Sequence, residues 1–146
     1  MNAGDEVDFA WITRENIGLL EGVGDDVFDE PIDPARLRRW ADATDHLMLL
    51  ALAEDRIVGM CTAMIHHHAD KATELYVDEV GVADDYRRRG IARRLMMTMF
   101  ERGRERGCTE AWVGTESDNR AARALYESLR PYEEDNCVFY LYRLDG

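Results

Sequence analysis

Two adjacent carboxylates, Asp78 and Glu79, stand directly before the apolar segment Val80-Gly81-Val82. A carboxylate held near an amine can take its proton, which is the role of a general base in group transfer. Side chains alternate between the two faces of a strand, so only one of the pair points straight into a given cleft unless the strand is bulged there. Two solvated or salt-bridged acids at a strand end are the alternative interpretation.

A basic run that contains a glycine, Arg87-Arg88-Arg89-Gly90-Ile91-Ala92, follows this segment. Gly90 and Ala92 keep bulky side chains away from the start of the helix that we predict next. The first N–H groups of a helix have no partner within it and lie at the positive end of its dipole, so they can bind a pyrophosphate. The arginines add positive charge. A short basic run can also be plain solvated surface, and this motif alone does not separate the two.

These residues must be positioned by a mixture of strands and helices. Alternation of polar and apolar residues predicts strands at residues 7–13 and 138–144, and largely apolar segments predict strands at 46–53, 57–65, 75–82 and 110–115. Capping and spacing predict helices from Thr13 to residue 20, from Asp33 and Pro34 to near residue 44, after Tyr86 to Gly107, and from a Ser117 or Asp118 cap to about residue 128. The order β-α-α-β-β-β-α-β-α-β indicates one α/β domain over residues 1–146.

The charge balance narrows the class of partner. The chain has 146 residues, with 18 Lys and Arg against 30 Asp and Glu, and a net charge of −12 at pH 7. Such a chain repels phosphate backbones and anionic lipid, which disfavours a nucleic-acid or membrane-surface binder and favours a cationic partner. No apolar stretch approaches the roughly 20 residues of a spanning helix, and residues 1–6 are acidic where a secretion signal is basic. We therefore expect a cytoplasmic protein.

The cysteines and histidines do not indicate a metal site. Cys61, Cys108 and Cys137 are odd in number, widely spaced and set among apolar neighbours, which is typical of reduced core residues. Consecutive histidines at 66–68 cannot all face one ion, and no Cys or carboxylate spacing completes a tetrahedral set. A loop histidine that lines an acceptor pocket stays open as a role for this run.

The stretch from Val80 to Leu95 closely resembles the acetyl-CoA signature of the GNAT superfamily of N-acetyltransferases. The core of that signature is Gln or Arg, two residues, Gly, one residue, then Gly or Ala, which Arg87, Gly90 and Ala92 match. A second GNAT motif is matched, in the order and spacing of the superfamily, by Asn119, Ala122, Leu125 and Tyr126. The resemblance covers the chain from residue 7 to residue 144.

The resemblance implies a GNAT fold, with a mixed central sheet whose middle strands splay apart and are flanked by helices. Acetyl-CoA would be the co-substrate, with its pantetheine between strands 75–82 and 110–115. The residues that the resemblance assigns to its binding are Val80 and Val82 through their backbone groups, the cradle Arg87, Arg88, Arg89, Gly90, Ile91 and Ala92, and Asn119. A helix N-cap accounts equally well for Asn119.

The same resemblance implies catalytic roles. Glu79 occupies the acidic position of related acetyltransferases that carry a single carboxylate here, so we expect it to be the general base, with Asp78 in support. We expect Tyr126 to protonate the departing thiolate, because a tyrosine with an ordinary pKa of about 10 carries its proton at neutral pH. A core aromatic is the alternative for Tyr126. Residues 129–132 replace the Gly-Phe turn that usually ends this helix in the superfamily.

Three acidic clusters suggest the acceptor, because a GNAT fold would place all three at the edge of the acceptor cleft. They are Asp25, Asp26, Asp29 and Glu30; Asp78 and Glu79; and Glu133, Glu134 and Asp135. Such a cleft suits a small polycationic amine. With its loop 27–30 and tail 130–134, the chain is similar to GNAT-type aminoglycoside 3-N-acetyltransferases, which confer antibiotic resistance by acetylating the 3-amino group of the deoxystreptamine ring. A polyamine or other small-amine acetyltransferase, a non-catalytic acetyl-CoA-binding regulatory module, and a homodimer stay open.

Overall fold

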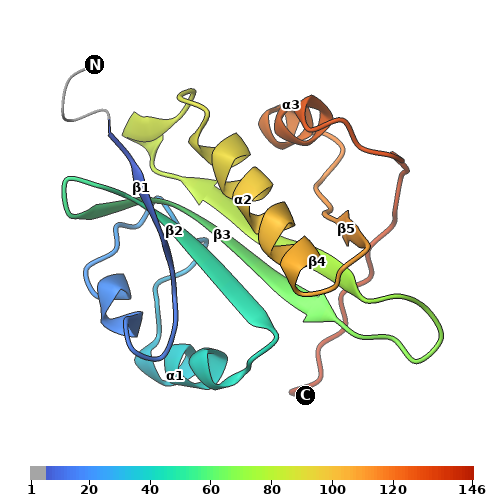
Figure 1. Cartoon of the computed structure of the whole chain (residues 1–146), viewed down its shortest axis with the longest axis horizontal. Helices are drawn as coiled ribbons and strands as arrows, with labels where there is room; N and C mark the ends of the chain where they lie inside the picture. Colours follow the sequence, from blue (N-terminus) through green and yellow to red (C-terminus); the bar gives the residue numbers. More distant parts are fainter. Residues whose placement is uncertain (1–5) are drawn as a thin grey trace. The chain divides into compact units, whose positions relative to one another are not determined.

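A computed structural model describes residues 6–146, so most of the acidic N-terminus that argued against a secretion signal, residues 1–5, lies outside the described part. The chain divides into two compact units, residues 1–114 and residues 115–146, which we describe separately. The described part of the first unit holds a five-stranded sheet (Figure 1). No helix within residues 6–146 is long and apolar enough to span a membrane.

The sheet is mixed, as predicted, and runs in the order β1-β2-β3-β4-β5. Neighbours from β1 to β4 are antiparallel, and β4 and β5 are parallel. The strands are β1 (Asp8–Trp11), β2 (His46–Ala53), β3 (Arg56–His66), β4 (Glu74–Val82) and β5 (Glu110–Trp112). A parallel neighbour requires a crossover connection, and the helix α2 (Ile91–Glu105) lies in the connection between β4 and β5.

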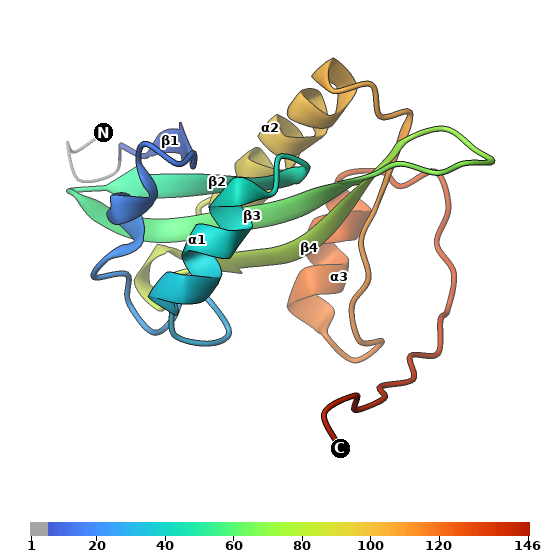
Figure 2. The ribbon, with the colours of Figure 1, turned by 90° about the horizontal axis from the view of Figure 1, so that it is seen from below.

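Helix α2 covers one face of the sheet (Figure 2), and it packs its apolar side on a core to which β2 and β3 contribute most of the buried residues. Its apolar residues recur every three to four positions and are buried: Ile91, Leu95, Met96 and Met99. A side chain at Gly59 in β3 would come within 3.2 Å of Leu95 Cδ1, so the glycine lets helix and sheet approach closely. The predicted spacing in this helix is confirmed.

A shorter helix, α1 (Pro34–Asp42), follows a loop that packs on β4. The Asp33 side chain caps α1 by accepting a hydrogen bond from the Arg36 N–H at 2.9 Å, and Pro34 opens the helix, as predicted. In the preceding loop Val27 is buried, and a side chain at Gly81 in β4 would collide with the Val27 carbonyl oxygen. Gly81 therefore permits the loop to lie directly on the strand.

Two predicted elements differ in the structure. Instead of a helix from Thr13, the chain forms only a 3-10 turn at Ile17–Leu20, because the Asn16 side chain accepts from the Thr13 N–H at 2.7 Å and donates to the Trp11 carbonyl at 2.9 Å. The strand predicted at 138–144 is also wrong. That segment is exposed, and within the described chain no strand pairs with it, so its backbone has no ladder to join.

The second unit contains α3 (Arg120–Ser128). Asn119, not the predicted Ser117 or Asp118, is its N-cap, since the Asn119 side chain accepts from the Ala122 N–H at 3.0 Å.

All three cysteines are free, but only Cys61 is a core residue: Cys108 is half-buried and Cys137 is exposed. Burial raises the pKa of the Cys61 thiol to about 12, so this thiol is held in its neutral form.

Candidate active site

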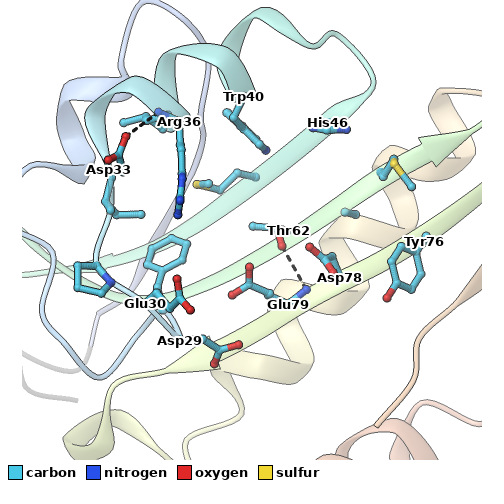
Figure 3. A pocket seen from close by; sticks show the side chains of 17 residues that line it. Asp29, Glu30, Asp33, Arg36, Trp40, His46, Thr62, Tyr76, Asp78 and Glu79 are labelled. Atoms are coloured by element: carbon cyan, nitrogen blue, oxygen red, sulfur yellow. Dashed lines mark hydrogen bonds between the residues drawn. The ribbon is translucent and has the colours of Figure 1, made fainter. Parts of the chain in front are cut away.

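A pocket of about 650 Å³ lies in the first unit, between the sheet, α1 and the loop before α1 (Figure 3). That volume falls within the roughly 300–1,000 Å³ that is common for small-molecule sites. The pocket is lined by Phe28, Asp29, Glu30, Pro31, Ile32, Asp33, Arg36, Leu37, Trp40, His46, Met48, Thr62, Ala63, Met64, Tyr76, Asp78 and Glu79. It therefore combines an apolar and aromatic wall with a group of carboxylates.

A bulge in β4 brings both predicted carboxylates to this pocket. Thr62 of β3 is the partner of Glu79, whereas the next residue, Ala63, is the partner of Val77, so Asp78 is an extra residue on β4. Such a bulge breaks the strict alternation of side chains between the two faces. The Glu79 N–H donates to Thr62 Oγ1 at 3.1 Å, which gives this backbone donor a partner at the bulge (Figure 3).

The pocket is strongly acidic. Five carboxylates line it, and Arg36 is the only Lys or Arg among the described lining residues. Partial burial is the main cause that raises the pKa of Glu79, and the neighbouring charges of Asp29, Asp78 and Glu30 raise it further. A carboxylate whose pKa is moved towards neutrality by its surroundings is suited to proton transfer, and the crowded negative charge attracts cations.

The aromatic and histidine lining was not predicted. No local pattern marks Trp40, His46 or Tyr76 as site residues, because the pocket is built from α1, β2 and β4, which are distant in the sequence. The Tyr76 ring stacks on Trp112 of β5, with ring centroids 4.2 Å apart. Trp112 itself is 47% exposed. The signal that could have found Trp40 was its place on the apolar face of α1.

The first acidic cluster divides into two parts. Asp29 and Glu30 line the pocket, whereas Asp25 and Asp26 do not. Asp26 Oδ2 accepts a hydrogen bond from the Asp84 N–H at 2.9 Å, so this carboxylate anchors the loop to the segment after β4. Arg56 lies 4.0 Å from Asp26 Oδ2.

Arg56 also binds the segment after β4 directly. It forms two hydrogen bonds to the Asp85 carboxylate, at 2.8 and 2.9 Å. The hydrogen bonds from the Arg56 guanidinium hold the pKa of Asp85 below its usual range. Asp26, Arg56 and Asp85 thus link the loop before α1 to the loop before α2.

The predicted anion cradle has the expected local geometry. Gly90 is the N-cap of α2 with φ +78°, and it makes no side-chain cap, so the first N–H groups of the helix are not taken up by a capping side chain. A side chain at Gly90 would meet no protein atom within 4 Å, so the space in front of the helix is open. This arrangement fits a pyrophosphate at the helix N-terminus.

The arginines of the cradle are partly engaged within their own loop. Arg87 pairs with Asp84 at 3.0 Å and donates through Nε to the Val82 carbonyl at 3.3 Å. Arg89 donates to the Asp85 carbonyl at 3.0 Å and lies over the Tyr86 ring. Arg88 has φ +63°, a conformation that is uncommon for a residue with a side chain. The loop is therefore held in a defined shape before α2 begins.

The middle strands separate where the resemblance implied a splay. Pairing between β4 and β5 ends at Tyr76 and Trp112, but β4 continues to Val82. Val80 and Val82 lie in the part of β4 that has no strand partner on the β5 side within the described sheet. Backbone groups on this side of β4 are free of strand pairing, although the Val82 carbonyl accepts from Arg87 Nε at 3.3 Å, and they suit the amides of a pantetheine.

The remaining predicted site residues belong to the second unit. Asn119 caps α3, which supports the cap account of this residue. Tyr126 lies in α3 and is half-buried. Glu133, Glu134 and Asp135 are exposed, and Glu134 lies 3.9 Å from Arg123. The roles of these residues in acetyl-CoA or acceptor binding stay predictions.

The histidines at 66–68 lie away from the pocket lining. His68 Nε2 is 3.2 Å from Glu74 Oε2, and His67 Nε2 is 3.5 Å from Asp45 Oδ2. Within residues 6–146, no group of three or more His, Cys, Asp and Glu side chains is arranged to hold a metal ion. The histidine that does line the pocket is His46.

Comparison with known proteins identifies the fold. The sequence profile of the acetyltransferase (GNAT) family matches residues 14–130. The structure superimposes on an aminoglycoside acetyltransferase from an uncultured soil metagenomic sample, in complex with sisomicin, with a TM-score of 0.85 and 20% identity over 95% of this chain and 97% of that one. It also resembles AAC(6′)-Iy in complex with a bisubstrate analogue, with a TM-score of 0.80 and 20% identity over 94% and 99%. The predicted fold class is confirmed.

Curated relatives point to more than one acceptor. Aminoglycoside N(6′)-acetyltransferase type 1 of Salmonella typhimurium is 26% identical over 101 residues, 66% of this chain and 70% of that protein. N-alpha-acetyltransferase 30 of Schizosaccharomyces pombe is 28% identical over 100 residues, 68% and 67%. The aminoglycoside enzymes of known position here are of the 6′ type, so the expected similarity to 3-N-acetyltransferases, and with it the 3-amino position, is not supported.

Proposed function

The chain belongs to the acetyltransferase (GNAT) family, and from that membership we propose that it transfers the acetyl group of acetyl-CoA to an amino group of an aminoglycoside. The choice of acceptor rests on the pocket beside the β4 bulge. This pocket has a volume of about 650 Å³ and is lined by five carboxylates and one arginine. The 6′-amino group is the proposed position, supported by the names of the aminoglycoside relatives.

The pocket chemistry supports a polycationic sugar. An aminoglycoside carries several ammonium groups, and each can form a charge-assisted hydrogen bond with a carboxylate such as Asp29 or Glu30. The aromatic rings of Phe28 and Trp40 offer flat apolar surfaces for the C–H faces of sugar rings. A single α-amine or a small monoamine would leave most of this negative charge without a partner.

The reaction needs a neutral amine and a proton for the departing thiolate. Glu79 takes a proton from the acceptor ammonium, and the freed nitrogen lone pair attacks the carbonyl carbon of the thioester. The C–N bond forms, the C–S bond breaks, and the electron pair of that bond leaves with sulfur. The Tyr126 hydroxyl gives its proton to the thiolate, and the tyrosinate takes the second proton from the acylated nitrogen, which leaves a neutral amide. Glu79 then releases its proton to solvent.

The co-substrate would lie along β4 and the start of α2. The open backbone edge at Val80 and Val82 would bind the pantetheine amides, and the N–H groups from Arg88 to Ala92 would bind the pyrophosphate. Arg87, Arg88 and Arg89 would add charge around it. The carboxylates of the acceptor pocket stand at residues 78 and 79 of β4, next to the proposed thioester end of the pantetheine.

The test is a panel of amines offered with acetyl-CoA, read by release of the free thiol. We expect turnover with sisomicin and, by NMR of the product, acetylation at the 6′-amine. Spermidine and a peptide with an N-terminal alanine are the competing acceptors. If the protein acetylates only spermidine, or only the peptide, that amine replaces the aminoglycoside as the acceptor. Binding of acetyl-CoA without turnover of any amine would favour a regulatory module.

A second acceptor class is supported by one specific observation, the relatives that modify protein N-termini. Besides the fission yeast protein, the [ribosomal protein bS18]-alanine N-acetyltransferase of Salmonella typhimurium is 32% identical over 84 residues, 58% of this chain and 53% of that protein. A peptide α-amine is therefore the alternative acceptor, and the peptide arm of the panel tests it directly.

The variant Glu79→Gln tests the base. The folded chain binds the Glu79 proton more tightly than the unfolded chain does, because the pKa of Glu79 is raised. The contribution of this group to stability is therefore present at low pH and is lost as the pH rises through the raised pKa. Glutamine should consequently not lower the melting temperature at pH 7, so a large loss of kcat with a normal melting temperature would assign the loss to chemistry.

A further inference from the structure

Arg36 is the side chain of the pocket whose charge opposes the charge of the rest. The pocket is lined by five carboxylates, and Arg36 is the only Lys or Arg among its described lining residues. Figure 3 shows the Arg36 side chain reaching from α1 into the pocket, on the side where Glu30 lies. A positive group at this place repels the ammonium groups of the proposed acceptor.

Arg36 is not held in the pocket by an ion pair. Among residues 6–146, no carboxylate oxygen lies within 4.0 Å of its guanidinium. The hydrogen bond to the Asp33 side chain is donated by the Arg36 backbone N–H and not by its side chain. The residue is exposed, and a guanidinium carries several N–H donors in a fixed planar arrangement. These donors are available to a ligand.

The place of Arg36 in α1 gives no benefit to the helix either. Asp33 is the N-cap of α1 and Pro34 opens it, so Arg36 lies in the first turn. The N-terminal end of a helix dipole is positive and disfavours a cation. Arg39, by contrast, lies in the last turn of the same helix, where positive charge is favourable. Neither an ion pair nor helix stability accounts for Arg36, whereas binding of a ligand does.

The chemistry of a guanidinium restricts the ligand group that it can bind. A guanidinium donates hydrogen bonds and accepts none, so its partner must carry a lone pair, as a hydroxyl oxygen does. An aminoglycoside carries hydroxyl groups between its ammonium groups. A hydroxyl that faces Arg36 accepts a charge-assisted hydrogen bond, whereas an ammonium in the same place has no lone pair and is repelled. Arg36 can therefore distinguish a hydroxyl from an amine at one position of the acceptor.

We propose that Arg36 is a specificity-determining residue, which selects acceptors that present a hydroxyl rather than an ammonium group to the α1 side of the pocket. This inference rests on the proposed function and adds to it. The proposed base Glu79 lies on β4, and Arg36 reaches into the pocket from α1, on the opposite side (Figure 3). With the 6′-amine at Glu79, the 2′ substituent lies on the far side of the same sugar ring, towards Arg36.

The carboxylates of the pocket cannot supply this selection. They attract any polycation, and they attract it more strongly the more ammonium groups it carries. Discrimination between closely related acceptors requires a group that disfavours one of them. Arg36 is such a group, because it makes one additional ammonium unfavourable at a particular place while the carboxylates still hold the others.

The test uses two aminoglycosides that differ in a single substituent. Kanamycin A carries a hydroxyl at the 2′ position and kanamycin B carries an amine there, and both have a 6′-amine. Calorimetry in the presence of CoA gives the two dissociation constants for the unaltered protein and for Arg36→Gln. We expect the ratio of these constants to move in favour of kanamycin B by about fivefold in the variant, which is the size of effect of one exposed charge pair.

Arg38→Gln is the matched control. Arg38 lies on the same helix and is exposed, but it does not line the pocket. Its substitution removes the same charge from the whole protein, so the affinities for the two kanamycins should change alike. Arg36→Lys keeps the positive charge and should keep most of the discrimination. The melting temperature of Arg36→Gln should not fall, since the substitution removes a cation from the first turn of α1.

The outcomes separate this inference from the proposed function. A ratio that is unchanged in Arg36→Gln, or that changes equally in Arg38→Gln, would overturn the inference and leave the aminoglycoside acceptor in place. Binding of both kanamycins with a preference that depends on Arg36, but without acetylation of either, would overturn only the proposed function. A protein that binds neither kanamycin would overturn both.

Discussion

Asp78 and Glu79 are consecutive residues of β4, and both line the same pocket because Asp78 is an extra residue opposite the Thr62–Ala63 step of β3. In a regular strand their side chains would point to opposite faces. The bulge instead places two negative charges side by side, and Asp78 is one of the charges that raise the pKa of Glu79. Partial burial and the charge of Asp29 are the larger causes of this raised pKa, and the bulge adds the charge of Asp78 to them.

The charge of Asp29 should shift the pH dependence of the reaction. Removing it in Asp29→Asn takes away a negative neighbour that disfavours ionised Glu79, so the pKa of Glu79 should fall towards its ordinary value. Ionised base would then be available at lower pH. We expect the acid limb of the profile of kcat/KM against pH to move to lower pH, whatever the change in its plateau.

Asp25→Asn is the matched control for this shift. Asp25 is on the same loop and is exposed, but it does not line the pocket and is not among the residues that affect Glu79. Its substitution removes the same charge from the whole protein. An equal movement of the acid limb in both variants would mean that overall charge, rather than contact with Glu79, controls the profile.

Gly90→Ala should weaken acetyl-CoA binding. A residue with a side chain at φ +78° costs about 1–2 kcal/mol, and the added methyl group would stand in the open space in front of α2, where we place the pyrophosphate. We expect the affinity for CoA, measured by calorimetry, to fall by about tenfold or more, which corresponds to about 1.4 kcal/mol or more.

Gly22→Ala separates backbone strain from loss of the cradle. Gly22 has φ +79°, and a side chain there also meets nothing within 4 Å, so the two substitutions carry a similar conformational cost. Gly22 lies outside the cradle. The stability of the two variants should fall alike, while the affinity for CoA should fall only in Gly90→Ala; an unchanged affinity in a folded Gly90→Ala protein would disprove the cradle.

Tyr126→Phe should lower turnover while leaving acetyl-CoA affinity close to normal. The substitution removes only the hydroxyl that we assign as proton donor and keeps the ring. General acid–base groups contribute about 100- to 10,000-fold, so we expect kcat to fall within that range in a thiol-release assay. A loss below roughly threefold would place the acid elsewhere.

The sequence predicted the elements whose pattern is local. The apolar run of β2, bounded by a turn at Glu54 and Asp55, gave the bounds His46–Ala53 that the structure has, because a continuous apolar run between polar turns has few other solutions. The spacing of Ile91, Leu95 and Met99 predicted α2 for the same reason. The prediction of a helix from Thr13 is wrong, because the Asn16 side chain forms hydrogen bonds with backbone groups of its own turn instead.

The site could be predicted only in part. Asp78, Glu79, Asp29 and Glu30 were proposed from the sequence, and all four line one pocket. Trp40, His46 and Tyr76 were missed, since no local pattern shows which face of the sheet α1 covers or which strands meet beneath it. Residues 138–144 show the same limit, because alternation predicts an extended chain, whereas a strand also needs an edge to pair with.

The link through Arg56 implies that binding of one substrate changes the affinity for the other. Asp26 holds the Asp84 N–H, and Arg56 holds Asp85, so the loop that presents Asp29 and Glu30 is bound to the loop that leads into the cradle. A ligand that orders one loop then lowers the entropic cost of ordering the other, and by thermodynamic linkage the effect is mutual. Calorimetry should find that CoA raises the affinity for an aminoglycoside by the same factor as the aminoglycoside raises that for CoA. In Arg56→Gln this shared factor should fall towards one, although neither ligand touches Arg56 in the proposed complex.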